Sequence, residues 1–159
     1  MLKKTVGSLM IGAFIMSSYA AAEEIGSVDT AFKLLGANHK IVISAFDDPK
    51  IEGVACHLSK AQTGGIKGSL GLAEDTSDAS IACRQIGPVS FKEEFEDGEE
   101  VFSERRSILF KKLHVVRFFD KKRNTLVYLA YSDKLIEGSP KNSISTVPIM
   151  PWPTSGTPR

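Results

Sequence analysis

The apolar positions of the chain fall into short runs of strand length, separated by turn-forming residues. The clearest run is 40–46, where Ile41-Val42-Ile43 is β-branched throughout and Asp47-Asp48-Pro49 ends the run, because proline has no amide hydrogen to donate to a ladder. The other predicted strands are 53–61, 79–86, 113–119 and 125–132. The last of these is apolar on both faces, which is typical of a central strand.

Two segments fit a helix or a strand. Residues 24–35 place Val28 and Leu35 on one helical face, and residues 103–110 partly cluster their apolar side chains in the same way. We expect the first segment to be extended, with a hairpin through 36–39. The second stays open between the two structures.

Together these patterns predict a single mainly β domain over residues 23–153. We expect about six to eight antiparallel strands in a sandwich or partly open barrel with little helix, and an α+β fold as the alternative. Ser139-Pro140 predicts one short helical turn. Because 147–153 holds three prolines, it should be extended and should not form a central strand. Residues 154–159 are predicted to be a disordered tail.

The first 22 residues have the pattern of a cleaved secretory signal peptide. Lys3 and Lys4 precede an apolar run over 6–16, and Ala20-Ala21-Ala22 ends it as a cleavage site. The apolar run is shorter than the roughly 20 residues that span a bilayer. Glu23 stands where a lipoprotein would need cysteine, so we expect an exported protein without a membrane anchor after cleavage.

The charge of the chain is nearly balanced, with 20 Lys and Arg against 19 Asp and Glu. This balance provides no basic footprint for DNA or RNA, and no broad attraction to anionic lipid.

Two cysteines in an exported chain are expected to pair, because the compartment is oxidising. Cys56 shares a strand face with Val54 and Leu58, and Cys83 shares one with Ile81. The pattern predicts a bridge inside the core that joins two strands, with a free thiol as the alternative.

The predicted bridge encloses a glycine-rich, acid-tipped segment that we interpret as a candidate binding loop. A nucleotide-binding loop requires the order Gly-Lys followed by Ser or Thr, whereas this segment has Lys67-Gly68-Ser69. The segment is therefore not such a loop. The alternating ligand order of an EF-hand calcium loop is absent too. Turn formation is the simpler explanation of the acidic residues. The candidate binding residues are Gly64, Gly65, Lys67, Gly68, Glu74, Asp75 and Asp78.

No motif predicts catalytic residues, a cofactor or a metal. His39, His57 and His114 lack the short spacings of zinc sites, and no G-x-S-x-G elbow is present. A hydrolase or metal-dependent enzyme built from these histidines and nearby carboxylates remains the rival hypothesis.

Two further positions are singled out by their surroundings. Arg117 lies in an otherwise apolar strand and needs a carboxylate if it is buried, with Asp133 or Glu137 as candidates. Pro148 and Trp152 belong to a proline-stiffened tail that either closes one end of the domain or docks into a partner.

Several stretches of the chain resemble the CreA family, and the resemblance covers the expected mature chain to Trp152. They are 23–30, Ala45-Phe46-Asp47-Asp48-Pro49, 63–68, 71–78, Tyr131-Ser132-Asp133-Lys134, and 138–142 leading to 147–151. The resemblance implies a small exported protein of the Gram-negative periplasm. It implies no catalytic residue.

These observations favour a non-catalytic periplasmic binding or accessory protein that uses the loop 64–78 and the tail 148–152. The expected partner is a protein or small molecule of the periplasm. Besides the enzyme hypothesis, a carrier that holds a small apolar ligand inside a barrel is an alternative.

Overall fold

The computed structural model describes residues 20–31, 39–62, 79–105, 112–133 and 141–153. These residues form eight strands and no helix. The strands are β1 (Glu23–Ala31), β2 (His39–Asp47), β3 (Ile51–Gln62), β4 (Ala79–Phe91), β5 (Glu99–Arg105), β6 (Lys112–Asp120), β7 (Thr125–Ser132) and β8 (Asn142–Pro148).

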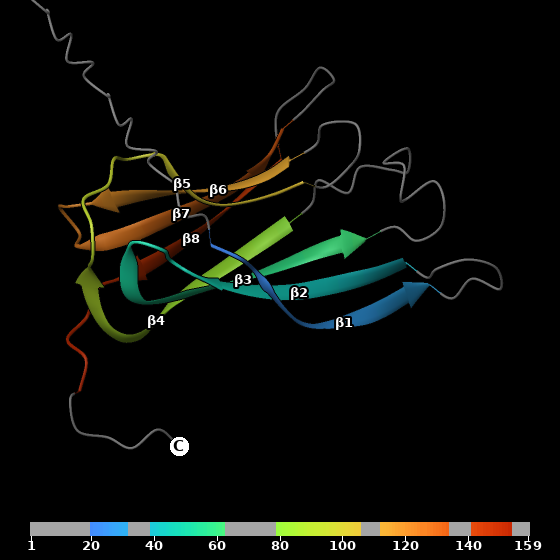
Figure 1. Ribbon diagram of the computed structural model, residues 1–159, viewed down its shortest axis with the longest axis horizontal. Coiled ribbons are helices and arrows are strands. Elements are labelled where there is room, and N and C mark those ends of the chain that lie inside the picture. Colours follow the sequence, from blue (N-terminus) through green and yellow to red (C-terminus); the bar gives the residue numbers. More distant parts are fainter. Residues whose placement is uncertain (1–19, 32–38, 63–78, 106–111, 134–140, 154–159) are drawn as a thin grey trace, which may run out of the picture.

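The strands form two four-stranded antiparallel sheets in which neighbours in sequence are neighbours in space. One sheet has the order β1-β2-β3-β4 and the other β5-β6-β7-β8. Figure 1 shows the two sheets as facing layers. The predicted mainly β, sandwich-like fold is therefore confirmed, and no closed barrel is formed by the described strands.

Each inner sheet face contributes alternate residues to one core. In β2, Val42, Ser44 and Phe46 are buried, whereas Ile41 and Ile43, which alternate with them, are exposed on the outer face. Phe46 stacks on Phe102 of the other sheet, with ring centroids 4.8 Å apart. This alternation is what a half-buried antiparallel strand requires.

The two sheets are also joined along β4 and β8 by polar contacts. The Cys83 amide donates to Ser145 Oγ at 2.8 Å, and Ser143 Oγ donates to the carbonyl of Ala79 at 3.0 Å. Farther along, Met150 and Gln85 exchange two hydrogen bonds of 2.9 Å between the backbone of Met150 and the amide group of Gln85. The tail is thus extended and anchored on β4 as far as Met150.

The strand predicted over 79–86 continues past Gly87-Pro88 to Phe91, so the predicted end of this strand was wrong. The pairing with β3 passes from Val54↔Gln85 to Glu52↔Ser90, so residues 86–89 of β4 bulge out opposite the single residue Gly53 of β3. This gap places Pro88 where no ladder amide is needed. Gly53 has φ +78°, and an added Cβ would lie 2.3 Å from the Pro88 carbonyl oxygen, so only glycine fits.

The remaining strand predictions are confirmed within the described residues. The segment that began at residue 24 is extended through Ala31, and the segment from 103 is strand through Arg105. β7 lies between β6 and β8 as a central strand, and β8 is an edge strand that ends at Pro148. The Ser139-Pro140 turn, the rest of both ambiguous segments, and residues 1–19 and 154–159 lie outside the described residues. Among those described, no helix has the length and apolarity to cross a membrane.

Candidate functional site

The predicted disulfide between Cys56 and Cys83 is confirmed. The two residues are directly opposite each other on β3 and β4, both are fully buried, and the sulfurs are 2.06 Å apart. The candidate loop residues that this bridge encloses, from Gly64 to Asp78, lie outside the described residues. In the tail, Pro148 and Trp152 are exposed, with 41% of the Trp152 surface accessible.

A buried ionic cluster lies at the end of the sandwich where β2 turns into β3. Arg117 is completely buried, and its Nη1 donates to Asp48 Oδ1 at 2.5 Å, while the Tyr128 hydroxyl donates to Asp48 Oδ2 at 2.8 Å. Glu99 Oε2 accepts from Arg117 Nη2 at 3.2 Å. Asp133 is not a partner of Arg117, so that prediction was wrong, because the sheet packing brings carboxylates of other segments to the arginine. The other predicted partner, Glu137, lies outside the described residues.

Asp48 links this cluster to the backbone of the turn. Its Oδ1 accepts the amides of Lys50 at 2.9 Å and Ile51 at 3.1 Å, so one carboxylate holds the turn, a β6 arginine and a β7 tyrosine. Burial of the phenol, together with the charge of Asp48, raises the pKa of Tyr128. The hydroxyl of Tyr128 therefore remains a hydrogen-bond donor at any physiological pH.

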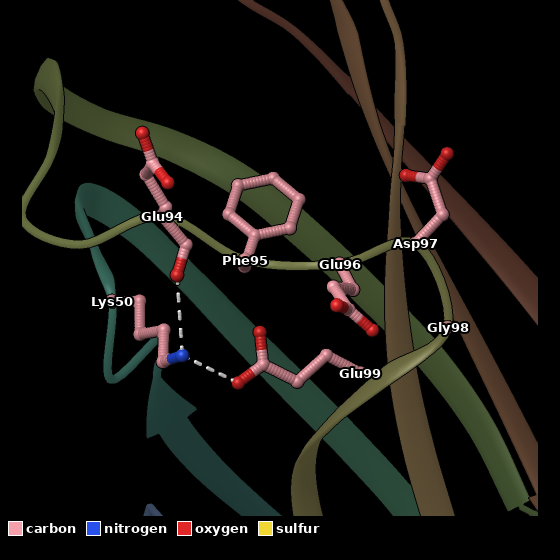
Figure 2. Close-up of a pocket in the computed structure, with 7 residues that line it drawn as sticks. All are labelled: Lys50, Glu94, Phe95, Glu96, Asp97, Gly98 and Glu99. Carbon is pink, nitrogen blue, oxygen red and sulfur yellow. Dashed lines mark hydrogen bonds and ion pairs between the residues drawn. The ribbon is translucent and has the colours of Figure 1, made fainter.

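The connection 92–98 between β4 and β5 covers this cluster and separates two surface hollows. The first hollow, of about 560 Å³, is lined by Lys50, Glu94, Phe95, Glu96, Asp97, Gly98 and Glu99. In Figure 2 the side chains of Lys50, Glu96 and Glu99 lie on one side of the connection. Lys50 Nζ is 2.6 Å from Glu99 Oε1 and donates to the Glu94 carbonyl at 3.3 Å. The hydrogen bond to Glu99 raises the pKa of Lys50.

The second hollow, on the other side of the connection, is aromatic. It has a volume of about 680 Å³ and is lined by Phe91, Lys92, Glu93, Glu94, Phe95, Asp97, Phe119 and Lys121. Figure 2 shows the ring of Phe95 and the carboxylates of Glu94 and Asp97 on the opposite side of the connection from Lys50 and Glu99. The guanidinium carbon of Arg117 lies 3.8 Å from the centroid of Phe95, so the wall between the hollows rests on the buried cluster.

A separate cluster surrounds His114 on the β5-β6-β7 sheet. Its Nδ1 contacts Glu100 Oε1, its Nε2 is 3.1 Å from Asp133 Oδ2, and its ring stacks on Tyr131 with centroids 5.1 Å apart. Burial of the ring lowers the pKa of His114, but hydrogen bonds to Glu100 and Asp133 and their charges outweigh burial, so the pKa is raised above 6.5. With a carboxylate at each nitrogen, the ring is best accommodated as the imidazolium.

This arrangement predicts a pH-dependent contribution to stability. Because the folded pKa is raised, the contribution is fully present below pH 6.5 and is lost as pH rises through the folded pKa. We expect the melting temperature of wild type to exceed that of His114→Gln most at pH 5.5, with the difference shrinking toward pH 8.5. His57→Gln, at an exposed β3 position, is the control. A difference that does not vary with pH would contradict the prediction.

The three histidines of the enzyme hypothesis are divided between the sheets. His39 and His57 belong to the first sheet and His114 to the second. Within the described ranges, no three His, Cys, Asp or Glu side chains are placed to hold a metal ion.

Of the groups described above, sequence analysis singled out Arg117 and His114 but missed both hollows. It assigned no role to the acidic segment 91–100. The signal in it is Phe91 and Phe95, two aromatic residues inside a run dominated by Glu and Asp.

Comparison with known proteins agrees with the resemblance read from the sequence. The family model described as CreA protein matches residues 25–152. The Protein CreA of Escherichia coli K12 is 58% identical over 148 residues, which cover 91% of this chain and 94% of that protein, and those of strains O6:H1 and O157:H7 match equally. No solved structure matches the chain. The chain belongs to the CreA family.

Proposed function

We propose that this chain is an exported, non-catalytic binding protein of the periplasm, and that its binding surface is the end of the sandwich formed by 48–50 and 92–98. The signal-peptide pattern of the first 22 residues supports export. A fully buried disulfide supports an oxidising compartment, because such bridges are rare in the cytosol.

The observation that carries the binding role is the pair of hollows that share the 92–98 wall. Binding sites are concave, and they combine apolar lining with a few fixed polar groups. Both properties meet here, since Phe91, Phe95 and Phe119 line one hollow and Lys50 with Glu99 line the other. Arg117 and Asp48 beneath them form a buried ion pair that holds the wall in place.

The loop singled out from the sequence belongs to the same proposal as a second candidate surface. Its neighbours Gln62 and Ala79 lie at the opposite end of β3 and β4 from Ile51 and Phe91, as the pairing register requires. Variants at the two ends therefore test the two surfaces separately.

Export is tested by extraction of the periplasm from Gram-negative cells that express the full chain. We expect the released protein to begin at Glu23, and a variant lacking residues 2–22 to stay in the cytoplasm. An intact N-terminus in the released protein, or release of the truncated variant, would argue against the proposed route.

Binding is tested by amide NMR of the mature protein during titration with a library of small molecules. We expect hits with dissociation constants of about 0.1–10 mM, and their shift changes should cluster at 91–99 and Phe119. Shift changes confined to the residues next to Gln62 and Ala79 would transfer the binding role to the loop. A library without any clustered hit would refute the binding function.

A further inference from the structure

We propose that the aromatic hollow binds an organic cation, a methylated or alkylated ammonium group, in the open corner formed by the rings of Phe91 and Phe119. This inference rests on the proposed binding function and names the class of ligand. It is argued from the rings, the charges on the rim and the position of Arg117.

The rings form a corner rather than a flat patch. Phe91 and Phe95 are nearly parallel, with centroids 6.0 Å apart, and Phe119 meets Phe91 at 58° with centroids 5.6 Å apart. Phe91 is 48% exposed although it lies beside two other rings. An aromatic ring carries negative potential on its face, and a corner of rings is the arrangement that receives ammonium groups without strong hydrogen bonds.

The rim favours positive over negative ligands. Glu93, Glu94 and Asp97 contribute carboxylates to the hollow. Lys92 is 3.1 Å from Glu52 and Glu93 is 3.8 Å from Lys50, so the charges of these two are offset by partners. Glu94 and Asp97 then oppose the single charge of Lys121, and the rim stays negative. Glu94 has no ion-pair partner within the part of the chain that the structure describes, and its carboxylate lies on the Phe95 side of the wall.

Two contacts keep the corner rigid before any ligand arrives. Asp97 Oδ1 accepts the amide of Phe119 at 2.9 Å, which ties the wall to the end of β6. Arg117 covers one face of Phe95, so this ring is already used by an internal cation. We therefore assign the ligand contact to Phe91 and Phe119. Preformed geometry lowers the ordering cost of binding.

The test uses two probes of the same shape, choline and 3,3-dimethylbutan-1-ol, in which a quaternary carbon replaces the charged nitrogen. They are titrated into the full mature protein and followed by amide NMR. We expect choline to shift residues at 91–97 and Phe119 saturably, and the neutral probe to bind about 3- to 30-fold more weakly. Raising the salt concentration should weaken only choline binding.

Two variants measure separately what the aromatic rings and the acidic rim contribute to choline binding. Phe91→Ala should weaken choline binding about tenfold, and Glu94→Gln should weaken it about threefold while leaving the neutral probe unchanged. Ile86→Ala, another exposed apolar residue of β4, and Glu24→Gln on β1 are the matched controls and should bind choline as wild type does. Melting temperatures of all four variants verify that the fold is retained.

The outcomes distinguish this inference from the proposed function. Equal affinity for the two probes, lost in Phe91→Ala, would overturn the cation assignment and leave an apolar binding site. Choline binding that Phe91→Ala and Glu94→Gln do not change would also overturn it. The absence of choline shifts, with library hits still clustering at 91–99, would reject the cation and retain the binding function.

Discussion

Replacing Arg117 with methionine should destabilise the protein by about 3–5 kcal/mol, or prevent folding altogether. The variant retains the aliphatic volume but leaves Asp48 buried without its cation, and removal of one member of a buried pair costs about this much. Urea unfolding monitored by circular dichroism measures the change in the free energy of unfolding. We expect the midpoint to fall with little change in slope.

A surface pair and a double variant are the controls for this experiment. Arg123 is exposed and pairs with Asp120 at 2.7 Å, so Arg123→Met should cost less than about 1 kcal/mol. Combining Arg117→Met with Asp48→Asn removes both charges and should recover part of the loss. If Arg117→Met were as mild as Arg123→Met, the buried cluster would not be a determinant of the fold.

Removing the disulfide by Cys56→Ala with Cys83→Ala should lower the free energy of unfolding by roughly 3–4 kcal/mol. The bridge closes a loop with a sequence separation of 27, and the chain-entropy model assigns a crosslink of this span that magnitude. Both sulfurs are fully buried, so the folded protein should also resist mild reductant. Urea unfolding of the double variant and of wild type under oxidising conditions gives the difference.

A thiol assay tests the state of the two sulfurs directly. Wild type unfolded without reductant should show no free thiol, and after reduction in denaturant it should show two. Free thiols in the unreduced sample would mean that the bridge is absent from the protein. If wild type and the double cysteine variant had the same free energy of unfolding, the bridge would not stabilise the fold.

Most of the strands and the disulfide could be predicted because their signals are local, whereas β5 and β8 were not predicted as strands. The β-branched run at 41–43 indicates a strand wherever it occurs, and the alternation around Cys56 places its sulfur on an apolar face. The extension of β4 past Pro88 could not be predicted, since it depends on Gly53 of the neighbouring strand, which lies opposite the bulged residues 86–89. The sequence of one segment alone does not indicate the segment with which it pairs.

The candidate site depends on contacts between distant segments, which single-sequence patterns do not report. Asp48 and Arg117 are separated by 69 positions and come from opposite sheets. Nearby carboxylates such as Asp133 are equally plausible partners in sequence. Phe119, in the same way, lies at the end of an apolar strand, and its sequence position gives no indication that its ring packs beside that of Phe91.

The division of the chain into two successive four-stranded sheets has a consequence for how the protein is assembled. Both cysteines belong to the first of these halves, and every strand that aligns them precedes residue 92. If the chain is exported amino end first, as proposed, both thiols reach the oxidising compartment before the second half has emerged. Closure of the cystine need not wait for Ser145, the β8 residue that later receives the Cys83 amide. The first sheet, already crosslinked by the disulfide, can then provide the surface against which the second sheet folds.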